Sequence, residues 1–144
     1  MSESFCSTNE IGDKFWRNKA GQYHRIDGPA IERADGTRCW YRNRRFHRTD
    51  GPAIEFSNGS KFWYQNGKRH REDGPAVERS SGLKKWFQKG KLHREDGPAI
   101  EYAYGKKEFW IRGVKFYYFS NFLSHLTEEE KEIALFHIGC FGAT

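Results

Sequence analysis

The sequence predicts an all-β repeat array: four to five β-hairpin or meander units of 23 residues in an elongated twisted or coiled sheet, with a C-terminal α-helical cap. The first observation is a nine-residue segment, HRxDGPAxE, which recurs every 23 residues from His24, His47, His70 and His93. The second is a column of glycines with the same spacing, Gly36, Gly59, Gly82 and Gly105. The third is a column of large aromatic residues, Trp40, Trp63, Trp86 and Phe109. Repetition at a fixed period of this length is the signature of a repeat architecture.

Length and composition set the outer limits of the prediction. With 144 residues the chain is the size of one domain, and an aromatic content of 17% distinguishes it from a disordered chain. The cysteines, Cys6, Cys39 and Cys140, are far apart without a C-x-x-C pair, which predicts a reducing compartment rather than a disulfide framework or a zinc knuckle. Neither a membrane span nor a secretory signal is expected, because the apolar stretches fall short of the roughly 18 residues that a span needs.

Along the chain we expect an N-terminal cap over residues 1–11, the repeats over 12–116 and a helical segment over 117–144. The first unit is one residue longer than the others between Trp16 and His24. A three-residue loop at 19–21, with its glycine in the left-handed conformation, restores the pairing of these two residues.

Turn residues predict the strand register of the later units. Asp35-Gly36, Asn58-Gly59 and Asn66-Gly67 each match a two-residue type I′ hairpin turn. These turns place Ile54 opposite Trp63, and Trp63 opposite His70, so one face is expected to carry a row of Ile, Trp and His. The equivalent rows are Ile31, Trp40 and His47; Val77, Trp86 and His93; and Ile100, Phe109 and Phe116. The opposite face is expected to carry Ala53, Tyr64 and Arg69.

The HRxDGP segment is expected to form a corner between units. Its Asp can accept hydrogen bonds from nearby backbone, its Gly can take a positive φ, and its Pro stops the previous ladder. The Glu that ends each motif is expected to pair with the Arg of the corner or with neighbouring basic residues; these are Glu32, Glu55, Glu78 and Glu101.

After Phe116 the apolar pattern becomes helical. Thr127 and Glu130 form a capping box, which predicts a helix over 128–138 that ends near Gly139. This helix would place Ile133, Phe136 and Cys140 on one face and cover the last hairpin, because repeat arrays need capped ends.

The segment WYQNGKRHREDGPAVERSSG resembles the membrane occupation and recognition nexus (MORN) repeat, which shares its length, an aromatic residue, Asn-Gly-Lys and a His. It differs at the corner, where HREDGPA replaces a shorter His-Gly-x-Gly. Over about residues 12–116 the HRxDGPAxE unit is more similar to small repeat proteins of bacteria and bacteriophages, some of them grouped with MORN-like antitoxins. The resemblance implies a phage-encoded, stand-alone binding protein that acts on a host component. Its expected location is the cytoplasm, which for a phage protein is the cytoplasm of the host.

The recurring His and acidic residues suggest metal or catalytic chemistry, but their pattern disfavours it. Successive units lie about 10 Å apart in such a sheet, whereas bonds to zinc are about 2 Å long. Phe116 stands at the His position of the last unit, and Phe neither binds metal nor transfers protons. Catalytic carboxylates need unequal environments, whereas Asp27, Asp50, Asp73 and Asp96 recur in identical contexts. We therefore expect a non-enzymatic protein without metal or cofactor, in which the His side chains pack against Trp.

Binding is the remaining expectation. The favoured function is a protein–protein inhibitor or antitoxin-like module that acts against an unidentified host defence or toxin protein. Nucleic-acid or nucleotide-signal binding through aromatic and basic columns is the alternative, supported by a net charge of +6, and a homo-oligomer stays open. The candidate binding residues are the basic column Arg38, Lys61, Lys84 and Lys107, the aromatic Trp40, Trp63, Tyr64 and Trp86, and the corner Arg48, Arg71 and Arg94.

Overall fold

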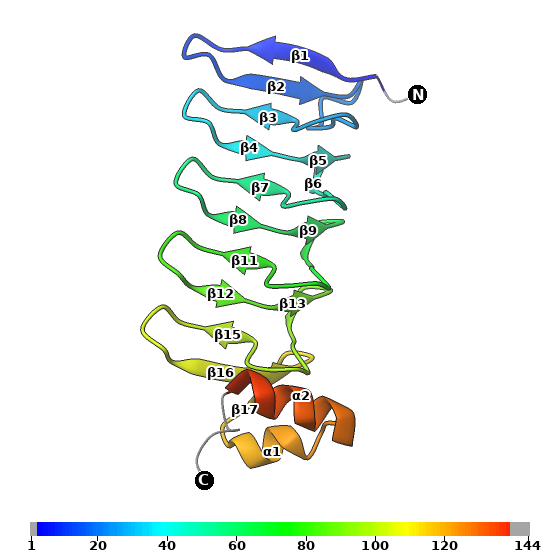
Figure 1. Ribbon diagram of the computed structural model, residues 1–144. Helices are drawn as coiled ribbons and strands as arrows, with labels where there is room; N and C mark the ends of the chain where they lie inside the picture. The colour runs from blue at the N-terminus through cyan, green and yellow to red at the C-terminus, as the bar shows by residue number, and fades with distance from the viewer. Residues whose placement is uncertain (1–2, 139–144) are drawn as a thin grey trace.

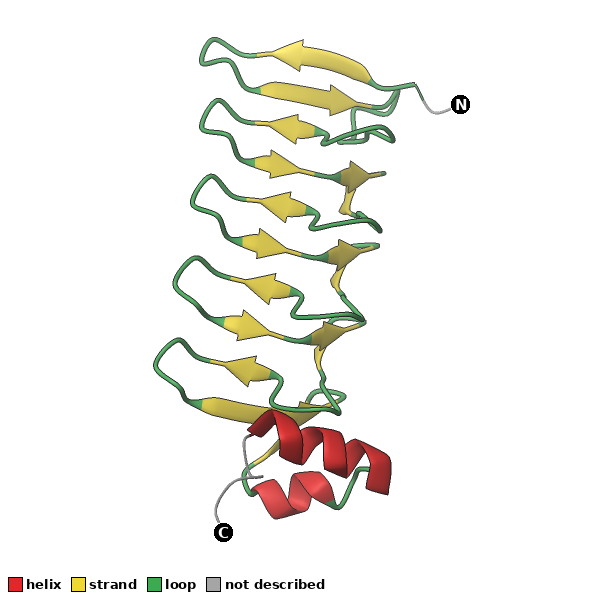
Figure 2. Cartoon of the chain, viewed as in Figure 1, coloured by secondary structure: helices red, strands yellow, loops and turns green. Residues whose placement is uncertain are grey.

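A computed structural model describes residues 3–138 as a ladder of β-hairpins that ends in two helices (Figure 1). Its main sheet consists of β1 (Phe5–Thr8), β2 (Lys14–Arg17), β3 (Ile31–Glu32), β4 (Arg38–Cys39), β7 (Ile54–Glu55), β8 (Lys61–Phe62), β11 (Val77–Glu78), β12 (Lys84–Lys85), β15 (Ile100–Glu101), β16 (Lys107–Ile111) and β17 (Val114–Phe116). These 11 strands are neighbours in this order, and every pair is antiparallel. The all-β array with a helical end that the repeats predict is confirmed (Figure 2).

Each of the three middle units adds a second, small hairpin at one side of the main sheet. The pairs are β5 (Tyr41–Arg42) with β6 (Arg45–Phe46), β9 (Tyr64–Gln65) with β10 (Lys68–Arg69), and β13 (Phe87–Gln88) with β14 (Lys91–Leu92). The type I′ turn at 66–67 is confirmed, because Asn66 and Gly67 have φ angles of 50° and 79°. The backbone N–H of His70 donates to the carbonyl of Trp63 at 3.2 Å, so the predicted Trp–His alignment is confirmed as well.

The first hairpin of each unit differs from the prediction by one residue. Only Gly59 of the Asn58-Gly59 pair has a positive φ, and the N–H of Phe56 donates to the carbonyl of Ser60, which closes a three-residue loop rather than a two-residue turn. Ile54 therefore pairs with Phe62 instead of Trp63, and the predicted Ile–Trp–His row is wrong in its first member. The same shift pairs Ile31 with Cys39, Val77 with Lys85, and Ile100 with Glu108.

The shifted register gives the array its thin apolar core. Ile54 and Val77 are buried on the side of the sheet away from the tryptophans, and Phe62 packs against both. A ladder of rings packs along the same side, with successive centroids between 4.2 and 6.2 Å apart: Phe15, Tyr23, Tyr41, Phe46 and Tyr64. Burial in this ladder raises the pKa of Tyr41 to about 12. The aromatic residues of this face are therefore mainly core.

The two ends of the array are built differently. At the N-terminal end β1 continues the main sheet, and the predicted three-residue loop is confirmed by a φ of 75° at Gly21 and an N–H bond from His24 to Trp16. At the C-terminal end α1 (Phe119–Leu123) and α2 (Glu128–Ile138) pack on β16 and β17 through a cluster of apolar side chains: Phe109, Phe116, Phe122, Leu126 and Ala134.

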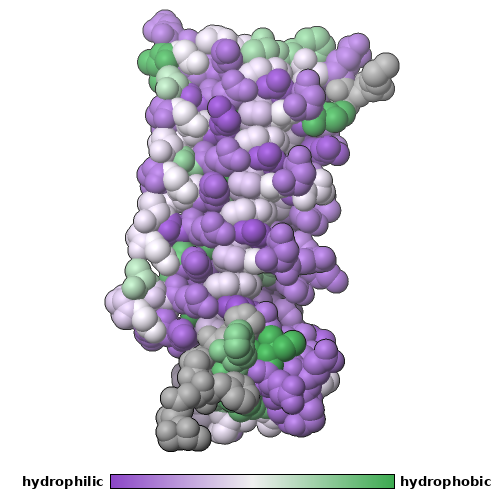
Figure 3. Space-filling model, in the orientation of Figure 1, coloured by the Kyte–Doolittle hydropathy of each residue, from purple (hydrophilic) through white to green (hydrophobic). Residues whose placement is uncertain are grey.

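The capping box at the start of α2 is present in both directions. The N–H of Thr127 donates to Oε2 of Glu130 at 2.7 Å, and the N–H of Glu130 donates to Oγ1 of Thr127 at 3.3 Å. Ile133 and Phe136 are exposed, and hydrophobic residues lie at the surface of the helical end (Figure 3). Ala134 is instead buried in the apolar cluster that joins the helices to β16 and β17. Gly139 and Cys140, the expected end of the helix and its last apolar position, lie outside the described residues.

Candidate functional site

Each corner between units is built around one arginine. Nε of Arg71 donates to Asp73 at 2.8 Å, and Nη1 donates to the carbonyl of Pro75 at 3.1 Å and to Glu78 at 2.9 Å. Its guanidinium carbon lies 4.0 Å from the centroid of the Trp63 ring, where a cation interacts favourably with the π face. The same contacts recur at Arg25, Arg48 and Arg94. The expected Glu–Arg pair is confirmed, and the Asp of the motif binds the arginine side chain.

The glycine of each corner leaves room for the arginine side chain of the same corner. The φ of Gly74 is not positive, so the predicted left-handed conformation is wrong. A Cβ at this position would lie 2.9 Å from Cζ of Arg71, closer than side-chain carbons approach. Glycine therefore allows the guanidinium to lie against the backbone between its carboxylates and the indole.

The histidine column links neighbouring units. Nδ1 of His70 accepts a hydrogen bond at 3.1 Å from the N–H of Lys89, which lies in the tip of the next small hairpin. The same bond recurs from Asn43 to His24, from Asn66 to His47 and from Arg112 to His93. The sequence predicts only packing for these side chains. In the structure they also accept hydrogen bonds. Because Nδ1 of each ring is the acceptor, the proton of the neutral imidazole is on Nε2.

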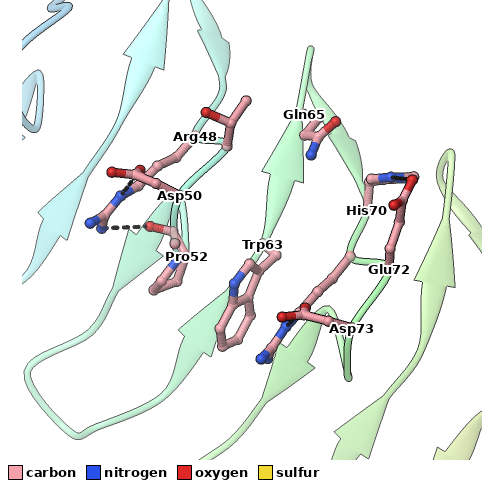
Figure 4. A pocket seen from close by; sticks show the side chains of 11 residues that line it. Arg48, Asp50, Pro52, Trp63, Gln65, His70, Glu72 and Asp73 are labelled. Atoms are coloured by element: carbon pink, nitrogen blue, oxygen red, sulfur yellow. Dashed lines mark hydrogen bonds and ion pairs between the residues drawn. The ribbon is translucent and has the colours of Figure 1, made fainter.

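Successive corners enclose three equivalent grooves. The central groove, of about 620 Å³, lies between the corners at 48–52 and 70–73, with the Trp63 ring between them and Gln65 and His70 at one side (Figure 4). The grooves one unit further along in each direction have volumes of about 590 and 540 Å³ and are lined by the equivalent residues. Among the predicted binding residues, the grooves thus bring together the tryptophans Trp40, Trp63 and Trp86 with the corner arginines Arg48, Arg71 and Arg94.

The carboxylates, rather than the arginines, face solvent in these grooves. The side chain of Arg71 is 21% exposed, whereas those of Asp73 and Glu72 are 83% and 84% exposed. A hydrogen bond and the charge of the adjacent Arg48 lower the pKa of Asp50, and Asp73 is affected in the same way by Arg71. A ligand in a groove therefore meets ionised carboxylates beside an indole ring.

The predicted basic column lies elsewhere and does not form a surface of one charge. Its members are exposed, but each stands in cross-strand register with glutamates: Arg38 with Glu32 and Glu55, Lys61 with Glu55 and Glu78, Lys84 with Glu78 and Glu101, and Lys107 with Glu101. Opposite charges at adjacent strand positions stabilise a sheet. Tyr64, the remaining candidate, belongs to the ring ladder and accepts a hydrogen bond from Arg69.

A different set of basic residues gathers at the tips of the small hairpins, where Glu72 and Glu95 lie beside them. These residues are exposed: Arg42, Arg44, Arg45, Lys68, Lys89, Lys91 and Arg112. The tips are stacked, because the N–H of Gly67 donates to the carbonyl of Phe46 at 2.9 Å and that of Gly90 donates to Arg69 at 2.8 Å. The sequence carried a signal for this surface in the 23-residue spacing of Arg45, Lys68 and Lys91.

Within residues 3–138, His, Cys, Asp and Glu side chains do not gather in any group of three or more that could hold a metal ion. Helices of the same part of the chain are too short or too polar to cross a membrane. Comparison with models of known protein families finds no match, and comparison with curated proteins finds no relative.

Proposed function

We propose that this chain is a non-enzymatic repeat protein that holds a segment of another protein along its row of corner grooves. In the particular form that the sequence resemblance implies, it is a MORN-like, phage-encoded inhibitor or antitoxin-like module that acts in the cytoplasm on a host defence or toxin protein. The observation that carries the proposal is the regular repetition of three grooves, each with an indole between two corners. Periodic sites on a repeat protein fit an extended partner.

The bonding of the corner residues supports binding rather than catalysis. Each corner arginine already donates to two carboxylates and a carbonyl, and each Nδ1 of the histidine column already accepts an amide hydrogen. A general acid or base must instead be available to the substrate, in an environment that distinguishes it from its neighbours. The corner residues are equivalent from unit to unit, which suits repeated contacts with one long ligand.

The experiment is affinity capture from a bacterial lysate with matched variants as bait, followed by mass spectrometry. Glu72→Lys changes an exposed side chain that lines two grooves, while Glu10→Lys makes the same charge change in the turn between β1 and β2. A protein retained by the unchanged chain and by Glu10→Lys, but lost with Glu72→Lys, supports the proposal. Partners retained equally by all three baits would contradict it.

Nucleic-acid binding is a second candidate, favoured by the basic hairpin tips rather than by the predicted columns. Contacts from such tips to phosphates make affinity fall steeply with salt, whereas contacts with aromatic rings do not. Binding of single-stranded DNA that is abolished between low and moderate salt, and by Lys68→Glu with Lys91→Glu but not by Glu72→Lys, would favour this candidate.

A further inference from the structure

The spacing of the grooves restricts the backbone conformation of a peptide that fills them all. Each unit contributes two strands to the main sheet, for example β7 and β8. Neighbouring strands lie 4.7–4.9 Å apart, so equivalent points recur about every 9.6 Å. The units stack in a nearly straight ladder, so the grooves form a line along its length (Figure 1).

A polyproline II helix matches this repeat. It advances about 3.1 Å per residue with three residues per turn, so every third side chain points in the same direction at intervals of about 9.3 Å. In an extended β-strand the third residue points to the opposite face. In an α-helix, side chains seven residues apart point in nearly the same direction and lie about 10.5 Å apart, so they fall out of step with the grooves by about 2 Å across three grooves.

The lining of the grooves determines the side chains that suit them. Indole rings pack well against proline, as in other aromatic-lined sites for polyproline II peptides. Carboxylates line the grooves beside the indoles. The central groove has Asp50, Glu72 and Asp73 with two arginines, Arg48 and Arg71; the groove next to α2 has Glu72 and Asp73 and the half-buried Glu95, Asp96 and Glu130, also with two arginines, Arg71 and Arg94. The groove at the other side has two carboxylates, Asp27 and Asp50, and three arginines, Arg25, Arg42 and Arg48. The excess of carboxylates over arginines in the grooves therefore increases toward the C-terminal cap, although the whole chain has a net charge of +6.

We propose that the grooves recognise a segment in the polyproline II conformation that carries a lysine or arginine at every third position, with its cations in the two grooves nearest α2. Prolines of the segment pack on the Trp63 and Trp86 rings, while the cations pair with the carboxylates of the corners. This inference rests on the proposed function, of which it specifies the ligand.

The test uses fluorescently labelled peptides of fixed composition and the full chain, measured by fluorescence anisotropy. The probe is (Lys-Pro-Pro)₄, and its control is the permuted KPKPPPKPKPPP, which has the same charge and proline content. A permuted peptide loses at least one groove contact, so we expect the regular peptide to bind about fivefold more tightly. We expect Glu72→Lys to weaken binding of the regular peptide by tenfold or more, since Glu72 lines both grooves, and Glu10→Lys to leave it unchanged.

Equal affinity for the regular and permuted peptides would overturn the polyproline II register. Equal affinity for (Glu-Pro-Pro)₄ would overturn the cationic specificity. Neither result would affect the proposed function if a captured protein still depends on Glu72, whereas insensitivity of both the peptide and the captured protein to Glu72→Lys would overturn both. Binding of (Lys-Pro-Pro)₄ that is retained in Glu72→Lys but lost on changing the hairpin tips would assign the peptide to another surface.

Discussion

Replacing His93 with phenylalanine tests whether the histidine column holds neighbouring units together. Nδ1 of His93 accepts the N–H of Arg112 at 3.1 Å, and the His93 side chain is 9% exposed. Phenylalanine keeps a ring of similar size but offers no acceptor. A partly buried N–H without its partner costs about 2 kcal/mol, which corresponds to a fall in Tm of about 6 °C for a chain of this length.

His70→Phe is the matched comparison one unit earlier in the array. Nδ1 of His70 accepts the N–H of Lys89 at 3.1 Å, the His70 side chain is 12% exposed, and Lys89 lies at an exposed hairpin tip as Arg112 does, so a similar fall in Tm is expected. The assay is thermal unfolding followed by circular dichroism, together with ¹⁵N NMR of the histidine rings. The spectra are expected to show Nδ1 without a proton in the unchanged chain. Equal Tm values for both variants and the unchanged chain, or a proton on Nδ1, would refute the role of the column.

Three further outcomes are expected from the same structure. Gly74→Ala should lower Tm, because a Cβ at this position would lie 2.9 Å from Cζ of Arg71 and displace the guanidinium from its carboxylates; unchanged Tm in Gly74→Ala would contradict the close contact. Deletion of residues 47–69, one whole period, should leave a folded chain of lower stability by circular dichroism, since repeats contact mainly their neighbours, and unfolding would contradict an open array. Pairing with Arg48 lowers the pKa of Asp50 in the folded chain. The stability that ionised Asp50 contributes is therefore complete above a pH of about 4 and is lost as the pH falls through the lowered folded-state pKa. Asp50→Asn should flatten the acid side of the stability–pH profile, and an unchanged profile would contradict the pair.

Much of the fold could be predicted because each unit repeats its own turn signals. The positive φ angles at Asn66 and Gly67, the three-residue loop ending at Gly21 and the capping box at Thr127 all follow from local backbone preferences. These features depend on residues adjacent in sequence, and a short-range pattern is sufficient to place them.

The error at Asn58-Gly59 has a physical cause. An Asn-Gly or Asp-Gly pair serves both a type I′ turn and a three-residue loop in which only the glycine is left-handed. Thr37 and Ser60, which follow Gly36 and Gly59, are buried. Their backbone N–H groups donate to Oδ1 of Asp35 and of Asn58 two residues earlier, which favours the longer loop. The tryptophans consequently lie on the face opposite the isoleucines, where they form the candidate site.

The site itself could be predicted only in part, because its contacts join residues of different units or depend on exact distances. The Glu–Arg pairing follows from charge, but the approach of Arg71 to Gly74 depends on the path of the backbone. The bond from Lys89 to His70 spans 19 residues and involves a main-chain N–H, which leaves no trace in side-chain identity. The exposure of a side chain could not be predicted either, since the sequence cannot distinguish the half-buried arginines of the corners from the exposed lysines of the hairpin tips.

The substitution of Phe116 for histidine in the last unit follows from the bonding of the column. Each histidine accepts an N–H from the small hairpin one unit further along, and the last acceptor is His93, whose donor lies between β16 and β17. Phe116 instead faces the helical cap, with its ring centroid 6.1 Å from Phe122 and 4.7 Å from His125. A polar acceptor there would be desolvated by the cap without a hairpin amide to bind, whereas a phenyl ring adds apolar contact. The change from His to Phe therefore marks the unit at which hairpin stacking gives way to helix packing, and it explains how an array of nearly identical units ends at a defined length.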